Sequence, residues 1–488
     1  MFSMRVPALC LAFSFSATAL GGLASQVDTV LADDAMPSSL EQAEAPADLE
    51  LIDGLLRIDV PGAFFGASVS SAGDVNADGY DDLIIGAPNF SDGGDTFGAA
   101  YVKFGGDGVL NSTPEVMLDV DQVDSSFATV VAGIGDVNCD GHADLAAGAY
   151  RYVPSQMAVG SVFIYHGGPA FDGTPDLRLD GAQADAGFGV DVAGLGDVDN
   201  DGCDDLGVGA PNHDHGQGPS GAVFVYLGAA EMSAQPDATL APDSGVESQF
   251  GWSLDGAGDV NGDGVADIVV GAFRYSNGEE NEGAMMIYHG TDGLVDTVAD
   301  LVLEGDAESA AFGFSVAGVG DLNGDGFHDI AVGAPFRMIN QIEEGAAFVF
   351  KGSPDGIDPA SMVTLQREQA HAAFGWDVAG GDFNADGFAD LLVGAPFYDS
   401  GQFDEGIAQL YRGGPGAFDA ERDALFQLDS DFAAAGLAVA SAGDLNGDGV
   451  PDIVIGAATY QDLDTGGVAA VFLGDDTLFE DDFEPPNQ

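Results

Sequence analysis

The sequence predicts an all-β protein, a seven-bladed β-propeller of four-stranded antiparallel blades. Two observations predict it: one unit of about 62 residues recurs seven times, and each unit holds four short apolar segments. The segments are separated by glycine-rich turns, with 73 Gly in 488 residues. Four short strands per repeat, arranged radially, make a propeller.

The repeat is defined by an acidic string, Asp-x-Asn/Asp-x-Asp-Gly-x-x-Asp, whose copies are separated by 62, 61, 62, 62, 61 and 62 residues. Chance cannot keep that register. Phe-Gly lies about nine residues upstream in five units, and an apolar run ending in Gly-Ala follows downstream. The copies begin at Asp74, Asp136, Asp197, Asp259, Asp321, Asp382 and Asp444.

Each unit is interpreted as four strands. The first leads from Phe-Gly to the acidic string, and the second is the run into Gly-Ala. Because the second strand is apolar on both faces, as at 268–270, its sheet should be covered on both sides. Segments such as 221–228 and 177–180 supply the third and fourth strands, and no stretch keeps a competing helical period.

The ends of the array predict a closed ring. The seventh unit ends after its third strand, at 468–473, whereas 55–59 matches the fourth-strand pattern before the first unit begins. We expect the N-terminal strand to pair into the last blade, which removes an exposed sheet edge. An open solenoid is the alternative, but it would need polar caps.

Composition restricts the function. The chain has 82 Asp and Glu against 11 Lys and Arg, a net charge of -71. So acidic a chain is repelled by phosphate backbones and anionic lipid, which argues against nucleic-acid and electrostatic membrane binding. A hydrophobic content of 46% argues against intrinsic disorder.

Four segments are expected along the chain. Residues 1–24 read as a secretory signal peptide, 25–52 as an acidic disordered leader, 53–474 as the propeller and 475–488 as an acidic tail of unassigned role. The mature protein is therefore expected to be secreted, extracellular or periplasmic. Cleavage would leave Cys139 and Cys203, which could pair in an oxidising compartment or remain free thiols.

The acidic strings are predicted metal sites. Positions 1, 3, 5 and 9 offer side-chain oxygens, position 7 a backbone carbonyl, and position 6 is always Gly, which permits a tight wrap. Such ligands suit up to seven Ca²⁺. A polar turn is the plain alternative for one string, but not for seven in register. The predicted ligands are Asp74, Asn76, Asp78, Tyr80 and Asp82; Asp136, Asn138, Asp140, His142 and Asp144; Asp197, Asp199, Asp201, Cys203 and Asp205; Asp259, Asn261, Asp263, Val265 and Asp267; Asp321, Asn323, Asp325, Phe327 and Asp329; Asp382, Asn384, Asp386, Phe388 and Asp390; and Asp444, Asn446, Asp448, Val450 and Asp452.

Phe-Gly, the acidic string and Gly-Ala-Pro in this order resemble the FG-GAP repeats of the integrin α-subunit head. The resemblance covers about residues 55–474. It implies a seven-bladed propeller with calcium loops on its lower face and ligand on its upper face. Integrins carry the loop in only some blades, whereas here every unit has it. The chain looks more like a free-standing secreted bacterial FG-GAP protein, so integrin signalling is not transferred to it.

A protein or glycan partner is expected on the face opposite the acidic loops, where arginines and aromatic residues recur between the second and third strands. Such residues are enriched at binding hot spots. Alternatively, the aromatic residues pack the blades and the arginines pair with neighbouring carboxylates. The candidates are Arg151, Tyr152, Arg274, Tyr275, Phe336, Arg337, Phe397, Tyr398 and Tyr460.

These features favour a non-catalytic adhesion or recognition module. An enzyme would need a constellation placed once that breaks the repeat, and we find neither a Ser/His/Asp set nor a catalytic insertion. A propeller polysaccharide lyase or hydrolase is one alternative, and a calcium-stabilised matrix or surface component is another.

Overall fold

The structure is a computed structural model that describes residues 54–58, 60–107, 113–120, 122–155, 157–216, 218–242, 247–293, 295–416, 418–428, 430–460 and 466–474. All of them lie in one compact unit, Asp48–Gln488. The expected signal peptide (1–24), leader (25–52) and tail (475–488) lie outside the described residues. These boundaries therefore stay predictions.

The described residues form 28 strands and no helix, in seven four-stranded antiparallel sheets. Each sheet is one blade, numbered here in chain order. Blade 1 holds β2 (Val69–Gly73), β3 (Asp82–Ala87), β4 (Ala99–Lys103) and β5 (Val116–Leu118). Blade 2 holds β6 (Phe127–Gly135), β7 (Asp144–Ala149), β8 (Ser161–Tyr165) and β9 (Leu177–Asp180). Blade 3 holds β10 (Val192–Gly196), β11 (Asp205–Ala210), β12 (Ala222–Tyr226) and β13 (Ala238–Leu240). Blade 4 holds β14 (Phe250–Gly258), β15 (Asp267–Ala272), β16 (Ala284–Tyr288) and β17 (Leu301–Glu304).

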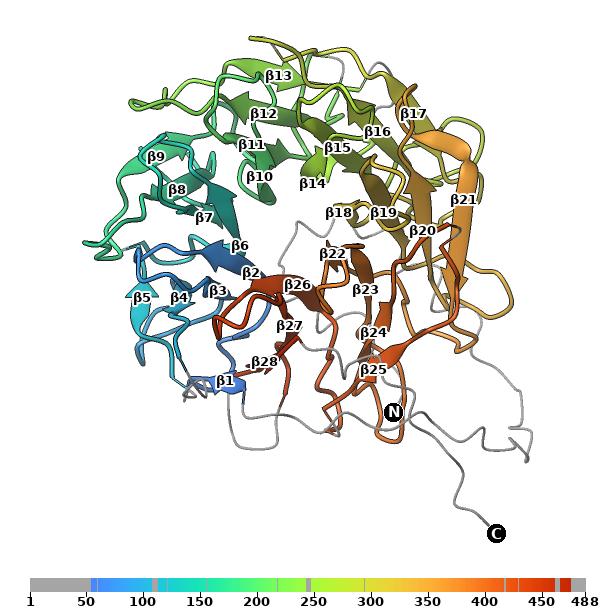
Figure 1. Cartoon of the computed structure of the whole chain (residues 1–488). Helices are drawn as coiled ribbons and strands as arrows, with labels where there is room; N and C mark the ends of the chain where they lie inside the picture. Colours follow the sequence, from blue (N-terminus) through green and yellow to red (C-terminus); the bar gives the residue numbers. More distant parts are fainter. Residues whose placement is uncertain are drawn as a thin grey trace. The chain divides into compact units, whose positions relative to one another are not determined.

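The remaining blades repeat the pattern. Blade 5 holds β18 (Val316–Gly320), β19 (Asp329–Ala334), β20 (Ala346–Lys351) and β21 (Asp358–Gln366). Blade 6 holds β22 (Val378–Gly381), β23 (Asp390–Ala395), β24 (Ile407–Tyr411) and β25 (Ala424–Phe426). Blade 7 holds β26 (Ala438–Gly443), β27 (Asp452–Ala457), β28 (Val468–Phe472) and β1 (Leu55–Arg57). The blades form a ring with the first strand of each nearest the centre, which confirms the predicted propeller (Figure 1).

The N-terminal strand closes the ring as predicted. β1 pairs antiparallel with β28, in the register Leu55 to Ala470, Leu56 to Ala469 and Arg57 to Val468. Leu56 is fully buried. The last blade is therefore completed by residues from the opposite end of the chain, so the ring has no missing outer strand.

The core lies between blades. Every second strand is six residues long, begins with the last Asp of an acidic loop, ends in Gly-Ala and is buried throughout. In one apolar cluster, Val223 and Leu240 of blade 3 pack with Ile268 and Val270 of blade 4. Because each sheet is covered on both faces by its neighbours, the second strand can be apolar on both sides.

The two motifs that define the repeat meet at the blade interfaces. A Cβ placed on Gly271 of blade 4 would lie 2.1 Å from the carbonyl oxygen of Gly313, which belongs to the Phe-Gly of blade 5. The ring closes in the same way, with Gly456 of blade 7 against the carbonyl oxygen of Gly66. Gly-Ala therefore provides the close backbone approach on which the next Phe-Gly docks.

Candidate metal centres and the opposite face

Seven acidic loops each join the first strand of a blade to the second, so all of them lie at the same end of the blades. Loops 1 to 7 are residues 74–82, 136–144, 197–205, 259–267, 321–329, 382–390 and 444–452. The third-to-fourth connections lie at this end too, whereas the Phe-Gly residues and the second-to-third connections lie at the other.

Each loop is shaped by its first carboxylate. In loop 4, Asp259 Oδ1 accepts a hydrogen bond from the Asp263 N–H at 3.0 Å and Oδ2 accepts one from the Gly264 N–H at 2.9 Å. The other six loops repeat both bonds. Gly264 has φ of +92°, as expected for the Gly at position 6. The backbone of each loop thus wraps around the carboxylate at position 1.

The Asp at position 9 has a structural role that the sequence analysis missed. Asp267 Oδ2 accepts a hydrogen bond from the Val260 N–H, and Oδ1 accepts one from the Gly290 N–H, both at 2.9 Å. The same two bonds recur in every blade and tie the loop to the end of the third strand. All seven carboxylates are buried. Burial raises the pKa of Asp267 to about 6 and that of Asp205 to about 7.

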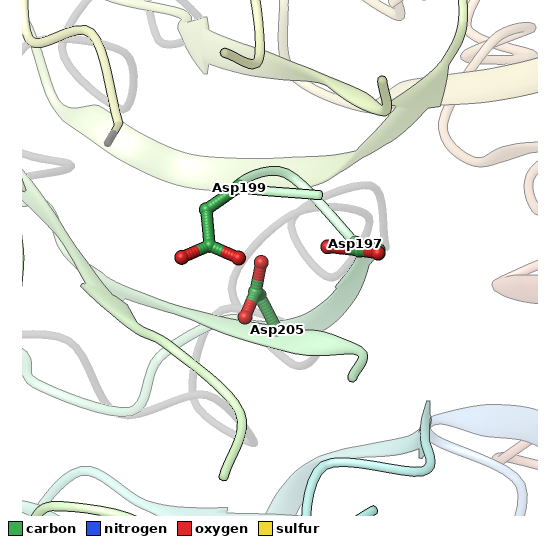
Figure 2. A group of neighbouring side chains, drawn as sticks. All are labelled: Asp197, Asp199 and Asp205. Carbon is green, nitrogen blue, oxygen red and sulfur yellow. The ribbon is translucent and has the colours of Figure 1, made fainter. Parts of the chain in front are cut away.

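Loop 3 brings three carboxylates together. Oxygen atoms of Asp197, Asp199 and Asp205 lie within 4.8 Å of one another (Figure 2). Asp199 is only 7% exposed, and its Oδ1 has no hydrogen-bond partner among the described residues. Asn76 Oδ1 of loop 1 is buried and unpartnered in the same way. Oxygens that are left unpaired within an oxygen-lined loop fit a hard divalent cation.

The loops differ in how their charges are offset. In loop 7, Asn446 Nδ2 donates to Asp448 Oδ2 at 2.9 Å, and loops 2 and 6 contain the same bond. Loop 3 has Asp199 at this position and therefore no amide to donate. Loop 6 also holds a cation of its own, because Arg412 Nη2 lies 2.8 Å from Asp386 Oδ2. Burial alone would raise the pKa of Asp386, but hydrogen bonds from the Phe388 N–H and from Arg412 lower it.

Neighbouring loops are in direct contact. Cys139, at position 4 of loop 2, forms a disulfide with Cys203, at position 7 of loop 3, with their Cα atoms 5.3 Å apart. The sequence analysis left open whether these two cysteines pair or remain free thiols, and in the structure they are paired. Where position 4 is Gly, the side chain at position 7 of the next loop packs on it, as Phe327 does on Gly262, Phe388 on Gly324 and Tyr80 on Gly447. The backbone adds to the contact, since the His328 N–H donates to the Asp259 carbonyl at 3.1 Å.

Six aromatic side chains form a connected cluster at the opposite end of blades 4 to 6. Each of them is half-buried. Ring centroids lie 4.9 Å apart for Trp252 and Phe273, 5.7 Å for Trp252 and Phe314, and 4.9 Å for Phe314 and Trp376. Phe336 lies 6.0 Å from Phe314, and Phe397 lies 5.6 Å from Trp376. We call this set the aromatic cluster: Trp252, Phe273, Phe314, Phe336, Trp376 and Phe397.

The cluster contains two of the nine residues expected to bind a partner, Phe336 and Phe397. Sequence reasoning missed the other four, although an aromatic residue directly follows Phe-Gly only in units 4 to 6, as Trp252, Phe314 and Trp376.

The remaining partner candidates are spread over several blades. The arginines make local contacts: Arg151 lies over Tyr150, Arg274 Nε donates to Asn281, and Arg337 lies over Phe348 and donates to the Gly305 carbonyl. Tyr275 is buried at 6% exposure, whereas Tyr152, Tyr398 and Tyr460 are half-buried. The structure therefore does not gather these residues into one patch.

Comparison with known proteins agrees with this architecture. The FG-GAP repeat family matches residues 65–102, 188–226, 250–284, 312–350, 374–411 and 435–472. Integrin alpha-5 of Xenopus laevis is 35% identical over 243 residues, which cover 47% of this chain and 21% of the integrin. Integrin alpha-IIb of Homo sapiens is 37% identical over 213 residues, covering 41% and 19%.

A protein named for an enzymatic activity also matches. Phosphatidylinositol-glycan-specific phospholipase D of Homo sapiens is 35% identical over 185 residues, which cover 36% of this chain and 22% of that protein. The chain thus spans about a fifth of the length of these relatives. Within the described part of the chain, no helix has the length and hydrophobicity needed to cross a membrane.

Proposed function

Because this chain is an FG-GAP repeat protein with an integrin α-like propeller, we propose that it is a secreted calcium-binding module for adhesion or recognition, without catalytic activity. The observation that carries the proposal is the repetition of one oxygen-lined loop in all seven blades. In loop 4 the carboxylates at positions 1 and 9 accept backbone N–H groups on both oxygens. The side chains at positions 3 and 5 each accept a single backbone N–H, on Oδ1. We attribute the recurrence of oxygen-bearing side chains at these two positions, beyond such single bonds, to a bound cation.

Calcium suits these loops because it takes six to eight oxygen ligands in flexible geometry. The residues that would hold it are those at positions 1, 3, 5 and 9, with the carbonyl at position 7. When bound, the ion would supply charge neutralisation to carboxylates that otherwise repel one another. Isothermal titration calorimetry of chelator-stripped protein with CaCl₂ should give up to seven sites, with weaker binding of MgCl₂. Absence of calcium binding at millimolar concentration would contradict the proposal.

The aromatic cluster is our candidate recognition surface. Aromatic residues dominate binding hot spots and also suit the faces of sugar rings. Its residues come from three blades that the loops on the opposite face hold in a ring, so a rigid ring would keep the surface pre-formed. Binding should be screened on glycan and extracellular-protein arrays in calcium. Trp252→Ala and Trp376→Ala together should abolish any binding found, whereas Phe432→Ala, an exposed aromatic residue outside the cluster, should not.

The disulfide supports secretion. Disulfides persist in oxidising compartments, and Cys139–Cys203 is formed in the structure. Intact mass of the exported protein should show loss of residues 1–24 and an increase of about 2 Da on reduction. Bacterial origin stays a prediction from the sequence.

The phospholipase match makes enzymatic activity the second candidate. We propose that the propeller itself does not catalyse, because its recurrent carboxylates serve the loops in all seven blades. Purified protein should be assayed on a glycosylphosphatidylinositol and on acidic and neutral polysaccharides. Turnover that persists after repurification would overturn the non-catalytic assignment. Absence of both turnover and array binding would favour the structural matrix role.

A further inference from the structure

We propose that the seven loops fill with calcium in a defined order, with loop 3 first and loop 6 last. This inference rests on the proposed calcium function and deepens it, because it identifies which parts of the ring respond when calcium is limiting. The order follows from chemical differences between loops that share the same backbone hydrogen bonds to their first and last carboxylates.

Loop 3 carries the most uncompensated negative charge and should bind a cation most tightly. It is the loop with four side-chain carboxylates, because Asp199 stands where the other six loops have Asn. Asp199 is more than nine-tenths buried, and its Oδ1 lacks a partner among the described residues. It shares a cluster with Asp197 and Asp205 whose oxygen atoms lie within 4.8 Å of one another (Figure 2). A buried carboxylate oxygen without a donor costs free energy that an ion would recover.

The comparison with loop 7 shows what loop 3 lacks. Asn446 Nδ2 donates to Asp448 Oδ2, so the cation-free loop already offsets part of its own charge. In loop 3 no amide is available at this position, and a fourth negative charge replaces it. Ligand charge count is one of the features that tune calcium affinity. Loop 3 therefore gains more from a cation than loop 7 does.

Loop 6 should bind calcium most weakly, because the guanidinium of Arg412 already contacts one of its carboxylates. Arg412 Nε and Nη2 both donate to Asp386 Oδ2, at 3.1 and 2.8 Å. A calcium ion that uses Asp386 must displace Arg412 or share the carboxylate with it. Both side chains are partly exposed, at 44% and 24%. The competition is therefore modest, worth up to about fivefold in affinity.

Hydrogen–deuterium exchange at graded free calcium tests the order in the full mature protein. Each loop lies in its own peptides once the Cys139–Cys203 disulfide between loops 2 and 3 is reduced in the quench step. Protection of 197–205 should appear at the lowest free calcium and that of 382–390 at the highest. Asp199→Asn should raise the midpoint of loop 3 about tenfold, into the range of the other loops. Arg412→Gln should lower the midpoint of loop 6 by up to about fivefold.

Two matched variants separate loop chemistry from general charge. Asn446→Asp gives loop 7 the fourth carboxylate and should lower its midpoint, a test that holds even if Asp199→Asn fails to fold. Arg178→Gln removes an arginine that pairs with Asp180 on β9 and should leave every midpoint unchanged.

The outcomes separate the two proposals. Coincident midpoints that the substitutions do not move would overturn the order while leaving calcium binding intact. The absence of calcium-dependent protection in any loop would instead overturn the proposed calcium function itself.

Discussion

The carboxylates of an acidic loop differ in burial and in the number of backbone hydrogen bonds that they accept. Asp267 is buried and accepts backbone N–H groups on both oxygens. Asp263 is exposed and accepts one N–H, from Val265. Asp267 is needed to hold the loop to the blade whether or not an ion is present. We propose that Asp263 mainly adds ligand oxygens.

Asp267→Asn should destabilise the protein in calcium and in chelator alike. The amide group would face one of the two N–H donors, and leaving a buried N–H unpaired costs about 1–3 kcal/mol. Urea unfolding at pH 7.5 measures this in EDTA and in CaCl₂. An effect confined to calcium would show that Asp267 serves only as a ligand.

Asp263→Asn should behave in the opposite way. Its Oδ1 can still accept the Val265 N–H, so the unfolding midpoint in EDTA should stay close to that of the wild type. In CaCl₂ the variant should lose part of the stabilisation, because one charged ligand is gone. Equal losses in both buffers would contradict this division of roles.

At the scale of elements, the blade interface explains both motifs of the repeat. The Gly of Gly-Ala on each second strand lies against the backbone of Phe-Gly in the next blade, or of the two residues that replace it, Phe127-Ala128 and Ala435-Gly436. The same contact joins blade 7 to blade 1. A side chain there would hold neighbouring backbones apart along the whole interface.

Gly271→Ala should therefore be strongly destabilising, by about 3 kcal/mol, since the new Cβ meets backbone that cannot move without separating blades 4 and 5. Gly414→Ala is the control, because a Cβ there meets no atom within 4 Å. Differential scanning calorimetry of both variants compares them. Similar melting temperatures would mean that the interface is looser than the structure shows.

The disulfide replaces one of the packing contacts between neighbouring loops. Cys139 and Cys203 are 64 residues apart, so the bond closes a long loop in the unfolded chain. Replacing both by Ala should cost about 2–4 kcal/mol. Denaturant unfolding without reductant measures the loss. In reductant the wild type should approach the variant, and a difference that survives full reduction would assign the effect to the alanines instead.

The fold could be predicted because each blade repeats the same sequence motifs and strand patterns in the same order. The loop oxygens and their Gly could be predicted for the same reason. The brace formed by Asp267 could not, because its partner Gly290 lies in another turn of the same blade. The contact of Phe327 on Gly262 was also missed, since it joins two different blades. Such contacts become visible only once the ring is closed.

At the scale of the whole molecule, a net charge of -71 must be accommodated. Part of this negative charge lies at the centre of the ring, away from the loops. Asp191 and Asp377 on the innermost segments accept N–H groups from the next blade, Leu254 and Val439. Burial raises the pKa of Asp191 and Asp255 to about 7 and that of Asp377 to about 6.

Stability in saturating calcium should consequently fall as the pH rises from 5 to 8. Between the ordinary carboxyl pKa and the raised values, the folded state binds more protons than the unfolded state, so each unit of pH costs stability. Asp255→Asn should flatten this slope in thermal melts, whereas replacing the exposed Asp355 by Asn should not. A slope that Asp255→Asn leaves unchanged would contradict the assignment.

The central claim is that cations bound in the seven loops hold the ring of blades together. Thermal unfolding of chelator-stripped protein in excess EDTA, in MgCl₂ and in millimolar CaCl₂ tests it most directly. Each loop filled to about 100 times its dissociation constant would contribute about 2.7 kcal/mol. The account predicts a large rise in melting temperature with calcium and a smaller one with magnesium. Coincident melts in EDTA and in calcium would contradict it.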